Sequence, residues 1–340
     1  MADERKMATK QRLALLLATI IMLGLVVSYS SGSLAGYLSG GTQNENENSE
    51  SNFEGNIKIS GAWALYPMMV KWAEEYQKIH PGVRIDISAG GAGKGMTDAL
   101  GGLVDIGMVS REIYPSEIER GAVWVACIKD AVVPTANANN PIADKLVETG
   151  VTKEMFEDIW VVENATTWGQ VVGTDAKDKI NVYTRSDSCG ASETWAKYLG
   201  NYKQEDLNGV GVYGDPGIAE AVRNDPLGIG YNNLNYAYDS NTEKPVDGLV
   251  VIPLDVNGNG EVDADEDFYS TKSELVDAII SNAYPSPPAR ELNLVTKEKF
   301  SGATKEFVKW ILTDGQQYGL ETGYIQLSQE RLNDGLAKLG

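Results

Sequence analysis

The stretch that decides the fold is residues 56–109, which read NIKISGAWALYPMMVKWAEEYQKIHPGVRIDISAGGAGKGMTDALGGLVDIGMV. Apolar and polar residues alternate at 56–60 and 83–88, as in half-buried strands, and 104–109 reads as a third strand. Each of the first two strands is followed by a loop and a helical pattern, so the stretch predicts a parallel α/β sheet. In such sheets, ligands bind at the loops beyond the carboxyl ends of the strands.

A helix is predicted between the first two strands. Pro67 suits its first turn, and Pro81-Gly82 ends it. Its apolar residues recur at spacings of three and four and are expected to face a core. They are Met69, Trp72, Tyr76 and Ile79.

The same order of elements recurs towards the C-terminus. Strands are predicted at 179–183 and 291–295, and helices at 191–199 and 305–313. The sequence therefore contains enough strand–loop–helix units for more than one α/β domain.

Composition excludes several classes of protein. The formal net charge is −19, and no Lys/Arg cluster follows the N-terminus, which argues against nucleic-acid binding. Two cysteines, Cys127 and Cys189, do not make a disulfide scaffold. The single histidine, His80, rules out most histidine-based metal and triad chemistry. With no nucleophile–base pair and no Walker loop, we expect a protein that is not an enzyme.

The N-terminus has the pattern of an exported protein. Basic residues precede an apolar run at 13–27, so residues 1–38 are predicted to be a signal peptide or a membrane anchor. Basic residues before such a run place the rest of the chain outside the cytoplasm. Residues 39–55 are polar and acidic and are predicted to form a disordered linker.

Three loops, at Ser60–Leu65, Gly90–Gly95 and Ser186–Ala191, each introduce a predicted helix. A helix N-terminus presents unpaired N–H groups and a positive partial charge, which together make an anion site. Arg185, beside the third loop, can give two hydrogen bonds to an oxyanion, and Asp187 can orient it. We therefore expect these helix starts to meet around a small anion.

The order of these motifs resembles the phosphate-binding proteins of ABC importers. The matching segments are ISGAWALYP at 59–67, GGAGKG at 90–95, VDIGMVSR at 104–111, RSDSCGAS at 185–192, GIGY at 228–231 and FVKWI at 307–311. The resemblance implies a type II periplasmic-binding-protein fold, in which two α/β domains joined by hinge strands enclose a cleft. It places domain I at 56–134 and 291–340, and domain II at 135–290.

The resemblance also implies which residues hold the anion. They are Trp63, Ala64, Leu65, Ala92, Gly93, Ser110, Arg185, Asp187, Cys189, Gly190 and Ala191. The first loop departs from the family pattern, because Ala62, Trp63 and Ala64 stand where the family has hydroxyl side chains. Backbone N–H groups must therefore contribute more of the binding.

The identity of the anion depends on an acceptor. Ser110 stands where some family members have an Asp that accepts the phosphate proton, and Asp187 is the alternative acceptor. Sulfate or molybdate is therefore the alternative ligand. Cys189, at a predicted helix start, is expected to have a lowered pKa. A thiolate would repel an anion, however, so we interpret Cys189 as a neutral filler of the ligand shell.

Residues 255–266, DVNGNGEVDADE, fit the ligand spacing of an EF-hand loop. The predicted ligands of Ca²⁺ are Asp255, Asn257, Asn259, Glu261 through its carbonyl, Asp263 and Glu266. A strand is predicted before the loop at 248–254 and a helix after it at 271–281. The loop lacks a first helix and a paired hand, so a structural calcium ion is expected rather than a sensor.

Taken together, these features predict an extracytoplasmic binding protein, anchored or secreted. It would capture phosphate and deliver it to the permease subunits of an ABC transporter. A receptor for another oxyanion, or a calcium-dependent interaction protein of the cell surface, is the alternative.

Overall fold

The structure is a computed structural model that describes residues 54–340. The predicted signal peptide or anchor at 1–38 lies outside the described residues, as does the predicted linker up to residue 53. Gly55, the last residue of that predicted linker, already belongs to strand β1.

We call residues 54–129 and 290–340 the first lobe. Its elements are β1 (Gly55–Gly61), η1 (Trp63–Leu65), α2 (Tyr66–Ile79), β2 (Val83–Ala89), α3 (Ala92–Leu100), β3 (Ile106–Val109), α4 (Pro115–Glu119), the start of β4 (Ala122–Asn137), most of β11 (Ala289–Lys297), α12 (Gly302–Leu312), η4 (Asp314–Tyr318), η5 (Leu320–Thr322) and α13 (Gln329–Leu339).

We call residues 130–289 the second lobe. It contains the rest of β4, then α5 (Ala143–Thr149), β5 (Val151–Thr152), α6 (Lys153–Glu157), η2 (Asp158–Val162), α7 (Trp168–Val172), β6 (Asn181–Arg185), α8 (Gly190–Leu199), η3 (Gln204–Asp206), β7 (Val210–Val212), α9 (Gly214–Asn224), β8 (Gly228–Asn233), α10 (Leu234–Ala237), β9 (Leu249–Val251), β10 (Leu254–Asp255) and α11 (Lys272–Ile280).

One sheet runs through both lobes in the order β2-β1-β3-β11-β4-β8-β6-β7, and β9 pairs with β4. β1 is parallel to both β2 and β3, which confirms the parallel arrangement predicted for residues 56–109. β11 is antiparallel to β3 and to β4. In the second lobe, β6 is parallel to β7 and to β8.

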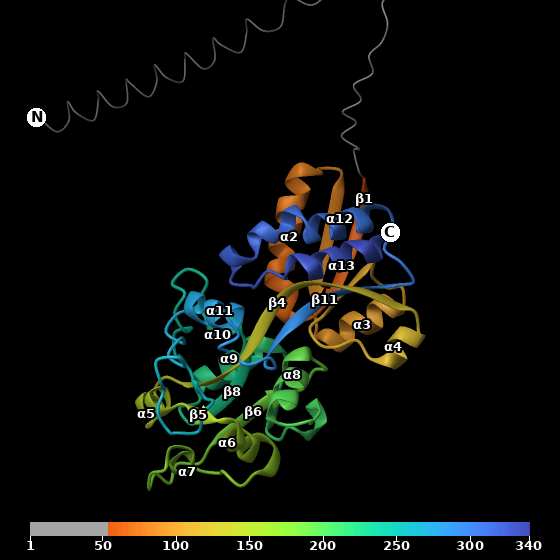
Figure 1. Ribbon diagram of the computed structural model, residues 1–340. Coiled ribbons are helices and arrows are strands. Elements are labelled where there is room, and N and C mark those ends of the chain that lie inside the picture. The colour runs from red at the N-terminus through yellow and green to blue at the C-terminus, as the bar shows by residue number, and fades with distance from the viewer. Residues whose placement is uncertain (1–53) are drawn as a thin grey trace, which may run out of the picture. The chain divides into compact units, whose positions relative to one another are not determined.

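The long strand β4 connects two hydrophobic cores. Ile128 belongs to the core of the first lobe, whereas Ala131, three positions later, belongs to the core of the second. On the partner strand β11, Ala289 and Leu292 divide between the cores in the same way. Figure 1 shows β4 and β11 passing together from α2, α12 and α13 towards α8 and α9. These two strands are therefore the hinge of the molecule.

Three local predictions differ from the structure. Ile79 is 57% exposed, because it is the last residue of α2 and lies beyond the core that buries Tyr76. Helix α3 begins at Ala92, so most of the predicted loop at Gly90–Gly95 is helical. The predicted strand at 248–254 is two short strands, β9 and β10, interrupted at Pro253, which has no backbone N–H to donate.

The glycines of α3 allow close packing rather than a loop conformation. A Cβ on Gly95 would lie 2.4 Å from the carbonyl oxygen of Met108 in β3. Within residues 54–340, no helix has the length and apolarity needed to cross a membrane.

Candidate functional site

The second and third predicted loops meet where the two lobes face each other. The amide of Gly93 donates a hydrogen bond of 3.0 Å to the carbonyl oxygen of Ser188. A Cβ on Gly91 would lie 2.6 Å from that same oxygen and 2.8 Å from Oδ2 of Asp187. The N-terminus of α3 is thus in direct contact with the loop that leads into α8.

Ser110 lies against the start of α8. Ser110 is 2% exposed, and a Cβ on Gly190 would lie 2.2 Å from its carbonyl oxygen and 2.3 Å from its Oγ. Only glycine permits this approach. The structure therefore brings Ser110, Gly190 and Gly93 together, although they come from three separate segments.

The first predicted loop reaches the same region through Trp63. The hydroxyl of Tyr236, from the second lobe, donates a 3.2 Å hydrogen bond to the carbonyl oxygen of Trp63. The indole lies against Gly214, where a Cβ would be 3.1–3.3 Å from the ring. The side chains of Ala64 and Leu65, by contrast, belong to the core of the first lobe, so only their backbone could meet a ligand. The amide of Leu65 already donates to the carbonyl oxygen of Ala62 at 3.1 Å.

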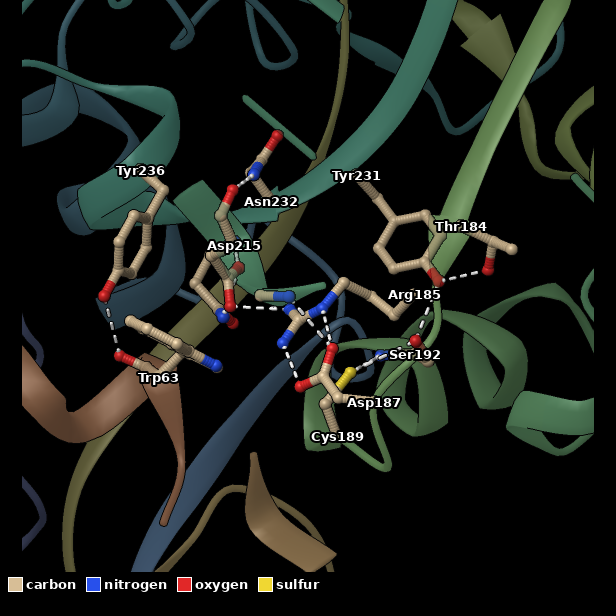
Figure 2. A network of polar contacts seen from close by, with 12 residues as sticks. Trp63, Thr184, Arg185, Asp187, Cys189, Ser192, Asp215, Tyr231, Asn232 and Tyr236 are labelled. Carbon is tan, nitrogen blue, oxygen red and sulfur yellow. Dashed lines mark hydrogen bonds and ion pairs between the residues drawn. The ribbon is translucent and has the colours of Figure 1, made fainter. Parts of the chain in front are cut away.

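Arg185, the last residue of β6, has a side chain with no exposure to solvent. Its Nε and Nη2 donate to the two carboxylate oxygens of Asp187, at 2.8 and 2.6 Å, and its Nη1 donates to Oδ2 of Asp215 at 2.6 Å (Figure 2). Asp187 thus orients Arg185, as expected from the sequence. A guanidinium has five N–H groups, so two remain for a ligand after these three bonds.

Asp215 is a member of this cluster that sequence reasoning missed. It is fully buried in the first turn of α9, and its Oδ1 accepts hydrogen bonds from the amide and from Nδ2 of Asn233, at 3.1 and 2.7 Å. An acidic residue at a helix start is a favourable partner of the helix dipole, and this signal in the sequence points to capping rather than to an ion pair.

The charge of the cluster is set by one guanidinium and two carboxylates. Burial lowers the pKa of Arg185, but the carboxylates of Asp215 and Asp187 outweigh burial and raise it well above its ordinary range. Arg185 therefore stays protonated, and its positive charge faces the side chains of Asp187 and Asp215. An anion placed here depends on N–H donors and not on excess positive charge.

A second arginine, Arg290 on the hinge strand β11, also lies beside Ser110. Its Nε is 3.5 Å from the carbonyl oxygen of Ser110, its Nη1 is 3.5 Å from Oδ2 of Asp130, and its Nη2 contacts Oδ1 of Asn233. Because Asn233 also donates to Asp215, a continuous polar chain links the hinge to Arg185. Sequence reasoning did not identify Arg290 or Asp130.

The expectation of a lowered pKa at Cys189 is wrong. Cys189 is 4% exposed, and burial raises the pKa of its thiol, although nearby Arg185 opposes this. The neutral Sγ accepts a hydrogen bond of 3.4 Å from the amide of Ser192 and so caps α8. The amide of Cys189 donates to Oε1 of Gln204 at 2.9 Å, so this predicted anion donor already has an acceptor.

The predicted calcium loop is closed by its first and last residues. Asp255 accepts hydrogen bonds from the amides of Gly258 and Gly260, and Oε1 of Glu266 accepts from the amide of Val256 at 2.8 Å. Asp255 and Glu266 are each 5% exposed.

The other predicted calcium ligands contact each other. Nδ2 of Asn257 and Nδ2 of Asn259 both donate to Oδ2 of Asp263, at 2.7 and 2.8 Å, and the amide of Glu261 donates to Oδ1 of Asn259. Across residues 54–340, no group of three or more His, Cys, Asp or Glu side chains is arranged to hold a metal ion. Coordination of Ca²⁺ would therefore require these side chains to turn their oxygens towards a common centre.

Comparison with known proteins agrees with this architecture. The family model of the PBP superfamily domain matches residues 42–315. The chain belongs to the PBP superfamily. The resemblance found in the sequence is confirmed by relatives named phosphate-binding protein PstS. The one from Methanocaldococcus jannaschii is 28% identical over 98% of this chain and 95% of its own length. The one from Bacillus subtilis is 26% identical over 83% of this chain and 84% of its own.

Solved structures of similar proteins confirm the two-domain fold. A structure titled as a phosphate ABC transporter substrate-binding protein of Clostridium perfringens with bound phosphate has a TM-score of 0.64, with 24% identity over 81% of this chain and all of that one. An ABC-type phosphate transport receptor of Vibrio cholerae has a TM-score of 0.58 and 21% identity, over 80% of this chain and all of that one. At these identities the likeness establishes the fold alone.

Proposed function

We propose that this chain captures inorganic phosphate between its two lobes and delivers it to the permease of an ABC importer. The observation that carries the proposal is the buried guanidinium of Arg185, fixed by two carboxylates with two N–H groups left over, at the place where three predicted anion loops meet. The names of the relatives support phosphate as the anion.

Ser110 is the acceptor that we propose for the proton of HPO₄²⁻. Both oxygens of Asp187 already accept hydrogen bonds, from Arg185 and from the amide of Gly214. The Oγ of Ser110 lies beside the first residue of α8, where phosphate would meet the helix dipole. A hydroxyl can both accept and donate, so sulfate and molybdate remain the competing ligands.

Capture requires the lobes to separate. In this conformation Gly93 contacts Ser188, and Gly190 contacts Ser110, without an intervening group. We propose that rotation about β4 and β11 opens these contacts to admit the anion, and that the lobes then close around it.

We also propose that the protein acts outside the cytoplasm, exported or anchored by residues 1–38, as expected from the sequence. A binding protein that hands phosphate to permease subunits returns it chemically unchanged, so no catalytic step is proposed. An interaction protein of the cell surface is the competing function, and it predicts no stabilisation by any of the anions.

Isothermal titration calorimetry and thermal unfolding of the full chain test the proposal. Phosphate, arsenate, sulfate and molybdate are compared, each with and without Ca²⁺. At 100 times its dissociation constant, phosphate is expected to stabilise the wild type by about 2.7 kcal/mol.

Arg185→Gln is expected to lose this stabilisation. Arg84→Gln is the matched control, since the side chain of Arg84 is 77% exposed and its ion pair, with Asp86, does not involve the site. Unchanged phosphate binding by a folded Arg185→Gln variant would exclude the site.

We propose in addition that the loop at 255–266 binds a structural Ca²⁺. Two buried carboxylates, those of Asp255 and Glu266, face backbone amides, and neither forms an ion pair with Lys or Arg of the described chain. The spacing of the loop residues supports calcium over a solvated acidic turn. Such an ion would fix β10 relative to the start of α11.

A further inference from the structure

The indole N–H of Trp63 is a buried donor without an acceptor. In the part of the chain that the structure describes, Nε1 of Trp63 is among the few buried side-chain atoms with no hydrogen-bond partner. Two others, the hydroxyl of Tyr76 and Nε1 of Trp195, lie inside the hydrophobic cores of the lobes. Trp63 belongs to neither core. Outside a hydrophobic core, a bound ion or water can complete such an unpaired donor.

The position of the indole places this donor at the seam between the lobes. Trp63 belongs to the first lobe, but its ring lies on Gly214 of the second, where a Cβ would be 3.3 Å from Nε1. The amide of Gly214 donates a 3.0 Å hydrogen bond to Oδ1 of Asp187, the carboxylate that orients Arg185. The indole of Trp63 therefore contacts a residue, Gly214, that is itself hydrogen-bonded to Asp187.

Tyr236 and Tyr213 fix the orientation of Trp63. The hydroxyl of Tyr236 holds the backbone carbonyl of Trp63 from the second lobe, and the ring of Tyr213 meets the indole edge-on with centroids 6.2 Å apart. A positive φ of 76° at Gly214 keeps that position free of a side chain. These contacts keep the N–H edge of the indole at the seam.

Other side-chain donors are missing from the first loop. Ser60 uses its hydroxyl on Asp98, at 2.7 Å, and Ala62, Ala64 and Leu65 have no polar side-chain atom. Trp63 is consequently the remaining polar side chain of the loop at 60–65 on the side of Arg185.

We propose that the indole N–H of Trp63 donates a hydrogen bond directly to the bound oxyanion. The inference rests on the proposed function of the cleft and adds a side-chain donor to it. An indole N–H donates and never accepts, so it holds phosphate and sulfate equally and leaves the choice between them to Ser110. Trp63 therefore sets affinity and not selectivity.

Substitution by phenylalanine removes the N–H and keeps an aromatic ring. Trp63→Phe in the full chain is expected to raise the phosphate dissociation constant about 10- to 100-fold, as for a lost hydrogen bond to a charged group. The ratio of phosphate to sulfate affinity is expected to stay constant. Trp310→Phe, in the core of the first lobe, makes the same chemical change away from the seam and is expected to bind phosphate as the wild type does.

A spectrum of the wild type tests the contact without relying on a variant. The chain has seven tryptophans, so ¹⁵N-tryptophan labelling gives seven indole signals. Saturation with phosphate is expected to move the Trp63 indole proton downfield, as for a new hydrogen bond to an anion. That signal is the one missing from the Trp63→Phe spectrum, or is identified by its contacts with Tyr213 if the variant does not fold.

The measurements distinguish a failure of the Trp63 hydrogen bond from a failure of anion binding itself. If the wild type binds phosphate, a Trp63 signal that does not move, or a Trp63→Phe variant with wild-type affinity, overturns the inference and leaves the proposed function intact. If the wild type binds none of the anions, the proposed function itself fails. Weaker phosphate binding by Trp63→Phe together with a changed ratio of phosphate to sulfate affinity would contradict the donor-only role.

Discussion

The backbone amide of Gly93, in the first lobe, donates a 3.0 Å hydrogen bond to the carbonyl oxygen of Ser188, in the second. Two of the loops that the sequence predicts to meet around an anion are thus bonded to each other across the seam. At a neighbouring contact, between Gly190 and Ser110, the two segments are even closer, because a Cβ built on Gly190 would clash with Ser110. The glycines of these loops let two backbones touch, and this contact is what we expect closure of the lobes to require.

Gly190→Ala is expected to prevent full closure. The new Cβ would lie 2.2 Å from the carbonyl oxygen of Ser110, a distance that real Cβ atoms do not tolerate. We expect the phosphate dissociation constant to rise at least about tenfold, equivalent to about 1.4 kcal/mol, with little change in unfolding temperature without ligand. Calorimetry measures the first quantity and a thermal melt the second.

Gly55→Ala is the control for this substitution. Its new Cβ would lie 3.3 Å from Cβ of Ala303, far from the seam. Equal phosphate affinity in Gly190→Ala and the wild type would show that the contact with Ser110 is not part of the bound state.

Asp215→Asn is expected to destabilise the second lobe. Asp215 is fully buried and accepts hydrogen bonds from Arg185 and Asn233, so its loss leaves a buried guanidinium with one carboxylate partner. We expect the free energy of unfolding to fall by about 3 kcal/mol, as when one member of a buried ion pair is removed. Chemical denaturation measures it.

Asp225→Asn provides a comparison for Asp215→Asn. Asp225, which is partly buried in the same lobe, accepts from Asn181 and Tyr183 and forms no ion pair with Arg185. If Asp215→Asn lowers the free energy of unfolding no more than Asp225→Asn does, Asp215 contributes little to holding Arg185.

Stability is expected to depend on pH through Asp130. Burial raises the pKa of Asp130 from 3.8 to about 6, although Arg290 opposes this. Between pH 6 and pH 4 the native state binds a proton at Asp130 while the unfolded chain has released it, so ionised Asp130 costs stability above pH 6. The unfolding free energy of the wild type relative to Asp130→Asn is expected to rise by up to about 3 kcal/mol as the pH falls from 7 to 4.

Denaturation of both proteins across this pH range measures the effect of Asp130. The comparison with Asp130→Asn cancels the contribution of other carboxylates. A difference that stays constant with pH, or that changes with the opposite sign, would contradict a raised pKa.

Calcium is expected to raise the unfolding temperature of the wild type, with half of the effect in the range of about 10⁻⁴ to 10⁻³ M seen for extracellular loops. Glu266→Gln is expected to abolish the shift, because the last position of the loop supplies a bidentate carboxylate. Asp267→Asn, an exposed substitution just after the loop, is the control and should keep the shift. If calcium raises the unfolding temperature of Glu266→Gln as much as that of Asp267→Asn, the proposed site is wrong.

Much of the architecture followed from local patterns. Alternation at 56–60 and 83–88 predicted strands β1 and β2, and the spacing of Met69, Trp72 and Tyr76 predicted the buried face of α2. Arg185 and Asp187 were recognisable because they lie two residues apart in one motif, and their side chains meet with almost no tertiary requirement.

The tertiary structure alone decided which groups surround that pair. Asp215 is 30 residues from Arg185, and Arg290 is 180 residues from Ser110, so no local pattern connects them. The same applies to the unpaired N–H of Trp63, whose ring lies against Gly214 of the other lobe. The sequence determined the repeating elements and the short motif at Arg185, since both depend on neighbours along the chain. The order of strands in the sheet and the contact between lobes determined burial, charge and pKa at the site, because these depend on neighbours in space.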